Sequence, residues 1–215
     1  MPTLAGTLRR TRHLAALARG AARRRAVAKR LRGLARPYNL NVGCGDVRVP
    51  DFLGIDANPR ARAVDLVWDA TLPLPLPHGS CARVYSEHFL EHLPRDEGRA
   101  WLRDCYRVLM PGGTLRIAMP SLRHIVAKYC SEDWRDQDWL RLPEFAHVQT
   151  RAHMINLAFR EWGHQWLYDD EELRCALVDG GFADVQFCPR NESLDPLLRG
   201  RETRTESLLV CEARR

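Results

Sequence analysis

Two glycines and one carboxylate in the first third of the chain could bind a nucleoside. Gly43 and Gly45 follow the β-type run 38–42, and Asp56 ends a second such run at 52–56. Glycines let a backbone approach a ligand closely, and a carboxylate at the tip of the next strand can accept both hydroxyls of a ribose. The pattern favours a nucleoside-containing cofactor, although a GxG pair alone is a weak signal.

The same segment differs from a dinucleotide-binding motif. Arg48 stands where a third glycine is required, and Asp56 lies 11 residues beyond Gly45 instead of the usual spacing of about 20. These departures count against NAD. They suit a cofactor without a pyrophosphate, for which no helix N-terminus need face phosphates.

A second group with chemical potential is His88-Phe89-Leu90-Glu91-His92, which fits the HxxEH pattern of inverted zinc peptidases. Two histidines four residues apart, beside a glutamate, could ligate zinc. The pattern directly follows a β-type run instead of lying within a helix, so we expect no metal site and no zinc hydrolase. His92 is expected to be a hydrogen-bonded structural residue.

From residue 38 onward, β-type runs alternate with helical patterns, which is typical of a parallel sheet with helices on both faces. Strands are predicted at 38–42, 52–56, 65–68, 82–86, 113–119, 185–188 and 207–211. An amphipathic helix is predicted at 95–109, ended by the Pro-Gly-Gly at 111–113. The segment 121–168 interrupts the alternation and holds four of the six tryptophans, which indicates a cap or acceptor-side insertion.

The positive charge of the chain is concentrated at its beginning. Residues 1–36 hold eleven Lys or Arg and no acid, whereas the remainder has 22 basic and 27 acidic residues, a net charge of −5. Apolar residues recur there at helical spacing, so we predict a basic amphipathic helical extension and one catalytic domain at 37–215. A helix that packs over the domain is the expected explanation. Recruitment to a nucleic acid or an anionic membrane surface through residues 1–36 is the alternative.

The seven cysteines are scattered singly without a CxxC pair, which argues against a disulfide framework and a Cys-rich zinc site. No run of 18 apolar residues occurs, and no apolar segment follows the N-terminal charges as a secretory signal would require. We therefore expect a cytoplasmic protein.

Six motifs, in their order and spacing, resemble those of class I S-adenosyl-L-methionine (SAM) dependent methyltransferases. They are LNVGCG at 40–45, GID at 54–56, WDA at 68–70, SEHFLEHL at 86–93, RVLMPGG at 107–113 and GGF at 180–182. The resemblance covers residues 38–213 and is greatest to small bacterial methyltransferases that tailor sugars or natural products. It implies an α/β, Rossmann-like fold whose seven-stranded, mostly parallel sheet has an antiparallel last strand.

The resemblance also implies which residues hold the cofactor. Gly43 and Gly45 would line its methionine and ribose parts, and Asp56 would hold the ribose hydroxyls. Asp69 and Ala70 would flank the adenine, and the residues after the fourth strand would lie near the methyl group. The full predicted set is Gly43, Cys44, Gly45, Asp56, Ala57, Asn58, Asp69, Ala70, Ser86 and Glu87.

Methylation of an oxygen requires loss of the acceptor's proton, which a neutral histidine can accept near pH 7. We predict His88 first and His164 second as catalytic residues. The expected reaction transfers a methyl group from SAM to an oxygen of a small-molecule or glycan acceptor, because the body is acidic and has no basic stripe interleaved with aromatic residues. The alternatives are an RNA methyltransferase that uses the Arg-rich N-terminus and a noncatalytic SAM-binding protein.

Overall fold

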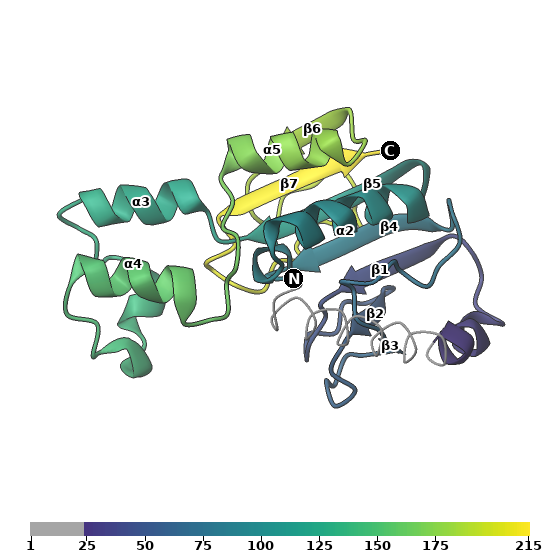
Figure 1. Cartoon of the computed structure of the whole chain (residues 1–215), viewed down its shortest axis with the longest axis horizontal. Helices are drawn as coiled ribbons and strands as arrows, with labels where there is room; N and C mark the ends of the chain where they lie inside the picture. The colour runs from purple at the N-terminus through teal and green to yellow at the C-terminus, as the bar shows by residue number, and fades with distance from the viewer. Residues whose placement is uncertain (1–23) are drawn as a thin grey trace, which may run out of the picture.

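The computed structural model describes residues 24–215, which form one seven-stranded sheet with a helical lobe beyond the carboxyl end of strand β5, residues Leu109–Met119 (Figure 1). The strands are β1 (Tyr38–Val42), β2 (Leu53–Asp56), β3 (Leu66–Val67), β4 (Cys81–Glu87), β5 (Leu109–Met119), β6 (Asp184–Phe187) and β7 (Leu209–Arg214). Their order is β3-β2-β1-β4-β5-β7-β6, and only β7 runs antiparallel to its neighbours. The predicted Rossmann-like sheet is confirmed.

Helices α2 (Arg95–Val108) and α5 (Asp170–Asp179) pack together over one face of this sheet (Figure 1). The buried face of α2 consists of Gly98, Trp101, Leu102, Cys105 and Val108. The helix ends there because Leu109 already pairs with Cys81 at the start of β5. The strand therefore begins earlier than predicted, and a bulge in β5 between Leu109 and Thr114, opposite Cys81 and Arg83 of β4, accommodates the Pro-Gly-Gly segment.

An irregular segment, residues 188–208, covers the opposite face of the sheet. Successive residues of a strand point to opposite faces, and Val84 joins the main core whereas Tyr85 packs with Leu198 in a second cluster. Arg116 of β5 is fully buried on this second face, where it forms ion pairs with Glu202 and Glu212. Within residues 24–215 this face is covered by a loop that ion pairs hold in place, whereas helices had been expected on both faces.

Residues 24–31 form a helix that belongs to the main core. Val27 and Leu31 are buried in that core, and the Arg24 guanidinium lies 5.0 Å from the ring centroid of Trp68. A boundary drawn after residue 36 would cut these contacts. The rest of the predicted basic extension, residues 1–23, lies outside the described part of the chain.

The insertion predicted at 121–168 forms the lobe to the left of the sheet in Figure 1. It contains α3 (Leu122–Cys130), η2 (Asp138–Arg141), η3 (Pro143–Phe145) and α4 (Arg151–Arg160). The side chains of Ser121 and Thr150 cap α3 and α4. The lobe has a small core of its own, formed by Leu140, Val148, Met154 and Leu157. No helix of the described residues has both the length and the apolar composition to cross a bilayer.

Candidate functional site

The loop after β1 has the shape of a ligand cradle. Gly43 (φ +70°) and Gly45 (φ +50°) both adopt left-handed backbone conformations that glycine enters without strain. A Cβ on Gly43 would lie 2.6 Å from the Phe89 ring, so this loop packs directly against the segment after β4. A Cβ on Gly45 would meet no atom within 4 Å, which leaves open space above the loop. The cradle thus fits a cofactor that lies flat against the backbone.

Asp56 stands beside this cradle at the end of β2. Its Oδ2 accepts the amide of Gly45 at 2.9 Å, and its Oδ1 accepts the amide of Asn58 at 2.8 Å. Each carboxylate oxygen has a second lone pair, so the side chain can still accept two hydroxyl groups. Ala57 and Asn58 follow it on the surface, whereas Cys44 is buried and its thiol lies toward Gly54. Cys44 can therefore contact the cofactor through its backbone.

Asp69 and Ala70 follow β3 at the neighbouring position of the sheet. The Oδ1 of Asp69 accepts the amide and the hydroxyl of Thr71, at 3.1 and 2.7 Å, which fixes the turn after the strand. Ala70 is buried. The structure therefore places both residues on the same edge of the sheet as Asp56, where the parallel strands β1, β2 and β3 end.

Ser86 and Glu87 end β4 and are buried. The hydroxyl of Ser86 has no hydrogen-bond partner within the described residues. Glu87, in contrast, accepts hydrogen bonds from the amides of Thr203 and Arg204 and from the hydroxyls of Thr203 and Ser207. Glu87 thus fastens the 203–207 loop over the end of β4.

His88 adopts a left-handed conformation (φ +50°) directly after β4. Such a conformation costs about 1–2 kcal/mol in a non-glycine residue, and strain of this kind clusters at functional sites. The hydroxyl of Ser207 donates to Glu87, so the Nε2–H of His88, 3.2 Å away, donates to that hydroxyl. Its Nδ1 lies 3.5 Å from Glu91 Oε1. Both ring nitrogens of His88 therefore face protein groups, and burial lowers its pKa to about 3.

His164 offers a nitrogen that is not used in this way. Its Nδ1 lies 2.6 Å from the carbonyl oxygen of Ala158, which requires Nδ1–H as the donor and leaves a lone pair on Nε2. Burial also lowers the pKa of His164, so the ring is neutral near pH 7. The amide of Gln165 donates to the Glu91 carbonyl at 2.8 Å, which brings His164 to 5.0 Å from the ring of His92.

A cavity of about 590 Å³ lies between the end of β4 and the lobe. Its lining includes both predicted catalytic residues, His88 and His164, and residues of α3 and of the segments 136–145 and 204–208. The glycine loop does not line it. One wall is aromatic: the ring centroids of Trp139, Phe145 and Trp162 lie 5.1–5.7 Å apart in edge-to-face contacts.

Two features of this site were not predicted. The aromatic wall is formed by Trp139, Phe145 and Trp162, which come from separate parts of the insertion. The sequence indicated only that tryptophans are frequent in this segment. The sequence identified Glu91 as a member of the HxxEH pattern but did not predict its burial. Glu91 is fully buried, and neither carboxylate oxygen has a hydrogen-bond partner within residues 24–215. Burial raises the pKa of Glu91 to about 7.

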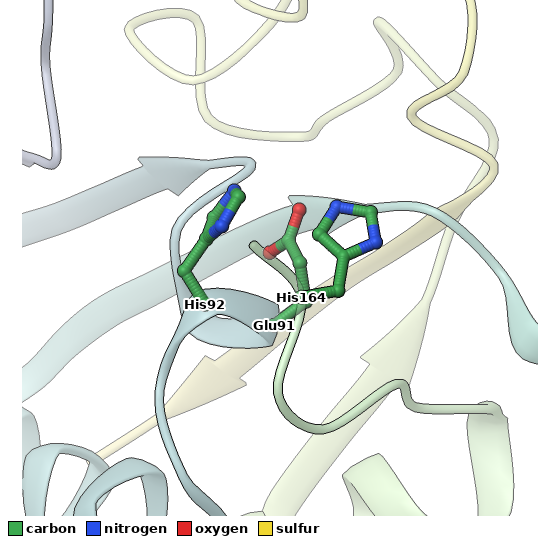
Figure 2. A group of neighbouring side chains, drawn as sticks. All are labelled: Glu91, His92 and His164. Atoms are coloured by element: carbon green, nitrogen blue, oxygen red, sulfur yellow. The ribbon is translucent and has the colours of Figure 1, made fainter. Parts of the chain in front are cut away.

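Of the HxxEH residues, Glu91 and His92 group with His164 from the insertion. Figure 2 shows that the Glu91 carboxylate lies between the rings of His92 and His164. His164 belongs to the C-terminal end of the insertion 121–168. The pattern spans the junction between β4 and the short helix η1 (Leu90–His92), as the sequence indicated.

The sheet has a glycine loop after its first strand, an acid after its second and a cavity beyond its fourth. This arrangement is typical of a Rossmann-like domain that binds a nucleoside-containing cofactor. Residues 40–117 match the family model described as a methyltransferase domain. The chain therefore contains a methyltransferase domain of the SAM-dependent kind, for which SAM is the cofactor.

Solved structures of similar fold include a SAM-dependent methyltransferase from Archaeoglobus fulgidus. It is 18% identical, with a TM-score of 0.52 over 89% of this chain and 94% of that one. A SAM-dependent methyltransferase from Thermotoga maritima, described as a possible histamine N-methyltransferase, is 18% identical, with a TM-score of 0.50 over 89% and 87% of the two chains. At these identities the likeness shows the fold alone. No curated protein matches the chain significantly.

Proposed function

We propose that the enzyme methylates an oxygen atom of a small-molecule or glycan acceptor bound in the cavity between β4 and the lobe. The observation that carries this proposal is the cavity itself. Its volume of about 590 Å³ is in the range of small-molecule sites, about 300–1,000 Å³. It lies beyond β4, and His88, which lines it, directly precedes Phe89, whose ring packs against Gly43 of the glycine loop.

The lining supports this class of acceptor. The aromatic wall offers flat apolar faces, on which a sugar ring or another small ring can lie. Asp136, Gln137 and Arg204 add donors and acceptors around it. An RNA acceptor would favour a positively charged groove with exposed stacking surfaces, whereas this cavity also contains the acidic residues Asp138 and Glu206.

Different residues of the chain bind the cofactor, orient the acceptor and accept its proton. SAM, when bound, supplies an electrophilic methyl group on a sulfonium. Gly43, Gly45 and Asp56 hold the cofactor, and the cavity orients the acceptor and excludes water, which favours an in-line displacement. The acceptor O–H must lose its proton as the new C–O bond forms. His164 has a lone pair available for that proton, whereas the Nε2–H of His88 donates to Ser207 and its Nδ1 faces the buried Glu91.

The test uses SAM with a radioactive methyl group and an extract of the source cells, separated into small-molecule, glycan, protein and RNA fractions. We expect label in the small-molecule or glycan fraction, stable to nuclease, protease and mild alkali, as an ether would be. Label that nuclease or protease releases, or no label in any fraction, would overturn the proposal.

A pair of tryptophan variants tests the cavity. Trp162→Ala should raise KM for the labelled acceptor about tenfold, since a lost aromatic contact is worth about 0.5–1.5 kcal/mol beyond its area. SAM affinity should stay unchanged. Trp166→Ala is the matched control, because Trp166 is similarly exposed (36% against 39%) but lies against Arg95 outside the cavity. Equal effects of the two variants would contradict binding at the aromatic wall.

A further inference from the structure

The buried carboxylate of Glu91 lacks a compensating group. It is fully buried, and neither oxygen has a hydrogen-bond partner within the described residues. The Nδ1 of His88 lies 3.5 Å from its Oε1 but donates no hydrogen bond to it, because the proton of that ring is on Nε2. A buried charged or polar group normally is paired, hydrogen-bonded or bound to a metal, because desolvation without compensation is costly. Something positive or proton-donating therefore belongs beside this side chain.

The neighbours of Glu91 are metal-ligating groups. One ligand atom each from Glu91, His92 and His164 lies within 4.8 Å of the other two. Figure 2 shows the three side chains side by side. Bonds from zinc to nitrogen or oxygen are about 2.0–2.2 Å long, so ligands of one ion lie about 3–4 Å apart and small side-chain rotations would suffice. The remaining ring nitrogen of His164 donates to the carbonyl of Ala158. Metal-bound histidines are typically oriented by such a bond.

We propose that Glu91, His92 and His164 bind one divalent transition-metal ion at the wall of the cavity. Two imidazoles and one carboxylate are a common set of protein ligands for catalytic zinc, which keeps a further position open. His92 and His164 line the cavity whereas Glu91 lies behind them. The open position of the ion therefore faces the space assigned to the acceptor. This conclusion replaces the sequence-based expectation of no metal.

The role of the ion rests on the proposed function. It would hold the acceptor oxygen at the cavity wall and polarise its hydroxyl group. The Nε2 lone pair of His164 would then bind the ion, so a metal-bound enzyme would not use His164 to accept the proton. The two roles of His164 exclude each other, and an experiment can separate them.

The test measures metal binding by the full chain after treatment with a chelator and dialysis. Titration with Zn²⁺ in a calorimeter should give one ion per chain, and Co²⁺ at the same site should show a visible absorption band. Loss of an outer-shell partner costs metal sites about 10–100-fold in affinity, so Glu91→Gln and His164→Gln should each weaken Zn²⁺ binding by at least about 100-fold. Circular dichroism checks that each variant is folded, and the half-exposed His164 provides the second variant if Glu91→Gln does not fold.

The matched control is His153→Ala. His147 and His153 form a second histidine pair, with ring centroids 5.2 Å apart, on the lobe outside the cavity. Its Zn²⁺ affinity should equal that of the wild type. The proposal is overturned if the wild type binds no stoichiometric Zn²⁺, if Glu91→Gln binds it equally well, or if His153→Ala removes the binding.

SAM binding, measured in the same samples, separates this proposal from the methyltransferase function. A protein that binds SAM and methylates its acceptor but takes up no stoichiometric Zn²⁺ on titration would overturn the metal site alone. A protein that binds Zn²⁺ through Glu91 while its labelled acceptor is not a small molecule or glycan would overturn the proposed function alone.

Discussion

Replacing Asp56 is the most direct perturbation of the cofactor site. Its two carboxylate oxygens each accept one backbone amide, from Gly45 and Asn58, and each retains a lone pair for a ribose hydroxyl. Hydrogen bonds to a charged group contribute about 1.5–3 kcal/mol each. Because the freed hydroxyls can bond to water in the variant, Asp56→Ala should weaken SAM binding by about 2–4 kcal/mol, or about 30–1,000-fold.

The same hydrogen bonds predict a second effect, on stability. Asp56→Ala also leaves the amides of Gly45 and Asn58 without their acceptor, so unfolding should become easier by about 1–2 kcal/mol. Asp56→Asn keeps one acceptor oxygen but turns an NH₂ group toward one of these amides. It should lose less stability than Asp56→Ala, and its SAM affinity should still fall about tenfold or more because the charge is lost.

Calorimetric titration with S-adenosylhomocysteine and thermal unfolding measure these two effects separately. Asp65→Asn is the control, because Asp65 accepts the amide of Gly54 at 2.8 Å in the same way but pairs with Arg48. It should lower Tm and leave cofactor affinity unchanged. If both Asp56 variants bind the cofactor within about threefold of the wild type, a difference below about 0.7 kcal/mol, Asp56 does not hold the ribose.

Two further substitutions and one labelling experiment have outcomes that follow from the packing and burial of the residues involved. Gly43→Ala should reduce SAM affinity at least about tenfold, since its Cβ would overlap the Phe89 ring and a left-handed alanine costs about 1 kcal/mol; calorimetry with unchanged affinity would refute this. Glu202→Gln should lower the free energy of unfolding in urea by about 3 kcal/mol, because Arg116 is fully buried against it; a loss below about 1 kcal/mol would show that Glu212 suffices alone. Iodoacetamide at pH 8 should label native protein at the exposed Cys130 and Cys175, and mass spectrometry should find the buried, high-pKa thiols unlabelled until unfolding: Cys44, Cys81, Cys105 and Cys211.

The sequence predicted those parts of the fold that local patterns determine. The bounds of β1 agree at both ends, and α2 begins at Arg95 as predicted. Local periodicity did not predict the start of β5, because Leu109 joins the sheet through its pairing with Cys81, a residue far away in sequence. The loop 188–208 has no helical period, and its place over the sheet depends on Arg116 and Glu202, which meet only after folding.

The same distinction applies to the site. Gly43, Gly45 and Asp56 lie in two adjacent strand ends, so their spacing predicted that they meet, and the structure brings them together. His164 meets His92 only because the lobe returns to η1, where the amide of Gln165 donates to Glu91. The spacing of residues in the sequence cannot predict such a long-range contact. The sequence also could not predict the tautomers of His88 and His164, on which their ranking as proton acceptors depends. Contacts with Ser207 and Ala158 determine these tautomers.

The fastening of the 203–207 loop by Glu87 has a consequence for how this enzyme can be altered. The proposed cofactor contacts of the glycine loop and of the ends of β2 and β3 come from residues 43–70. The cavity is built from the lobe and from residues 204–208, which the Glu87 bonds hold in place. Diversity introduced at 204–208 and in the lobe can therefore change which acceptor is selected while the cofactor loop is left intact. A library restricted to these two segments, with Glu87, Thr203 and Ser207 kept constant, is the economical starting point for redirecting the enzyme to new acceptors.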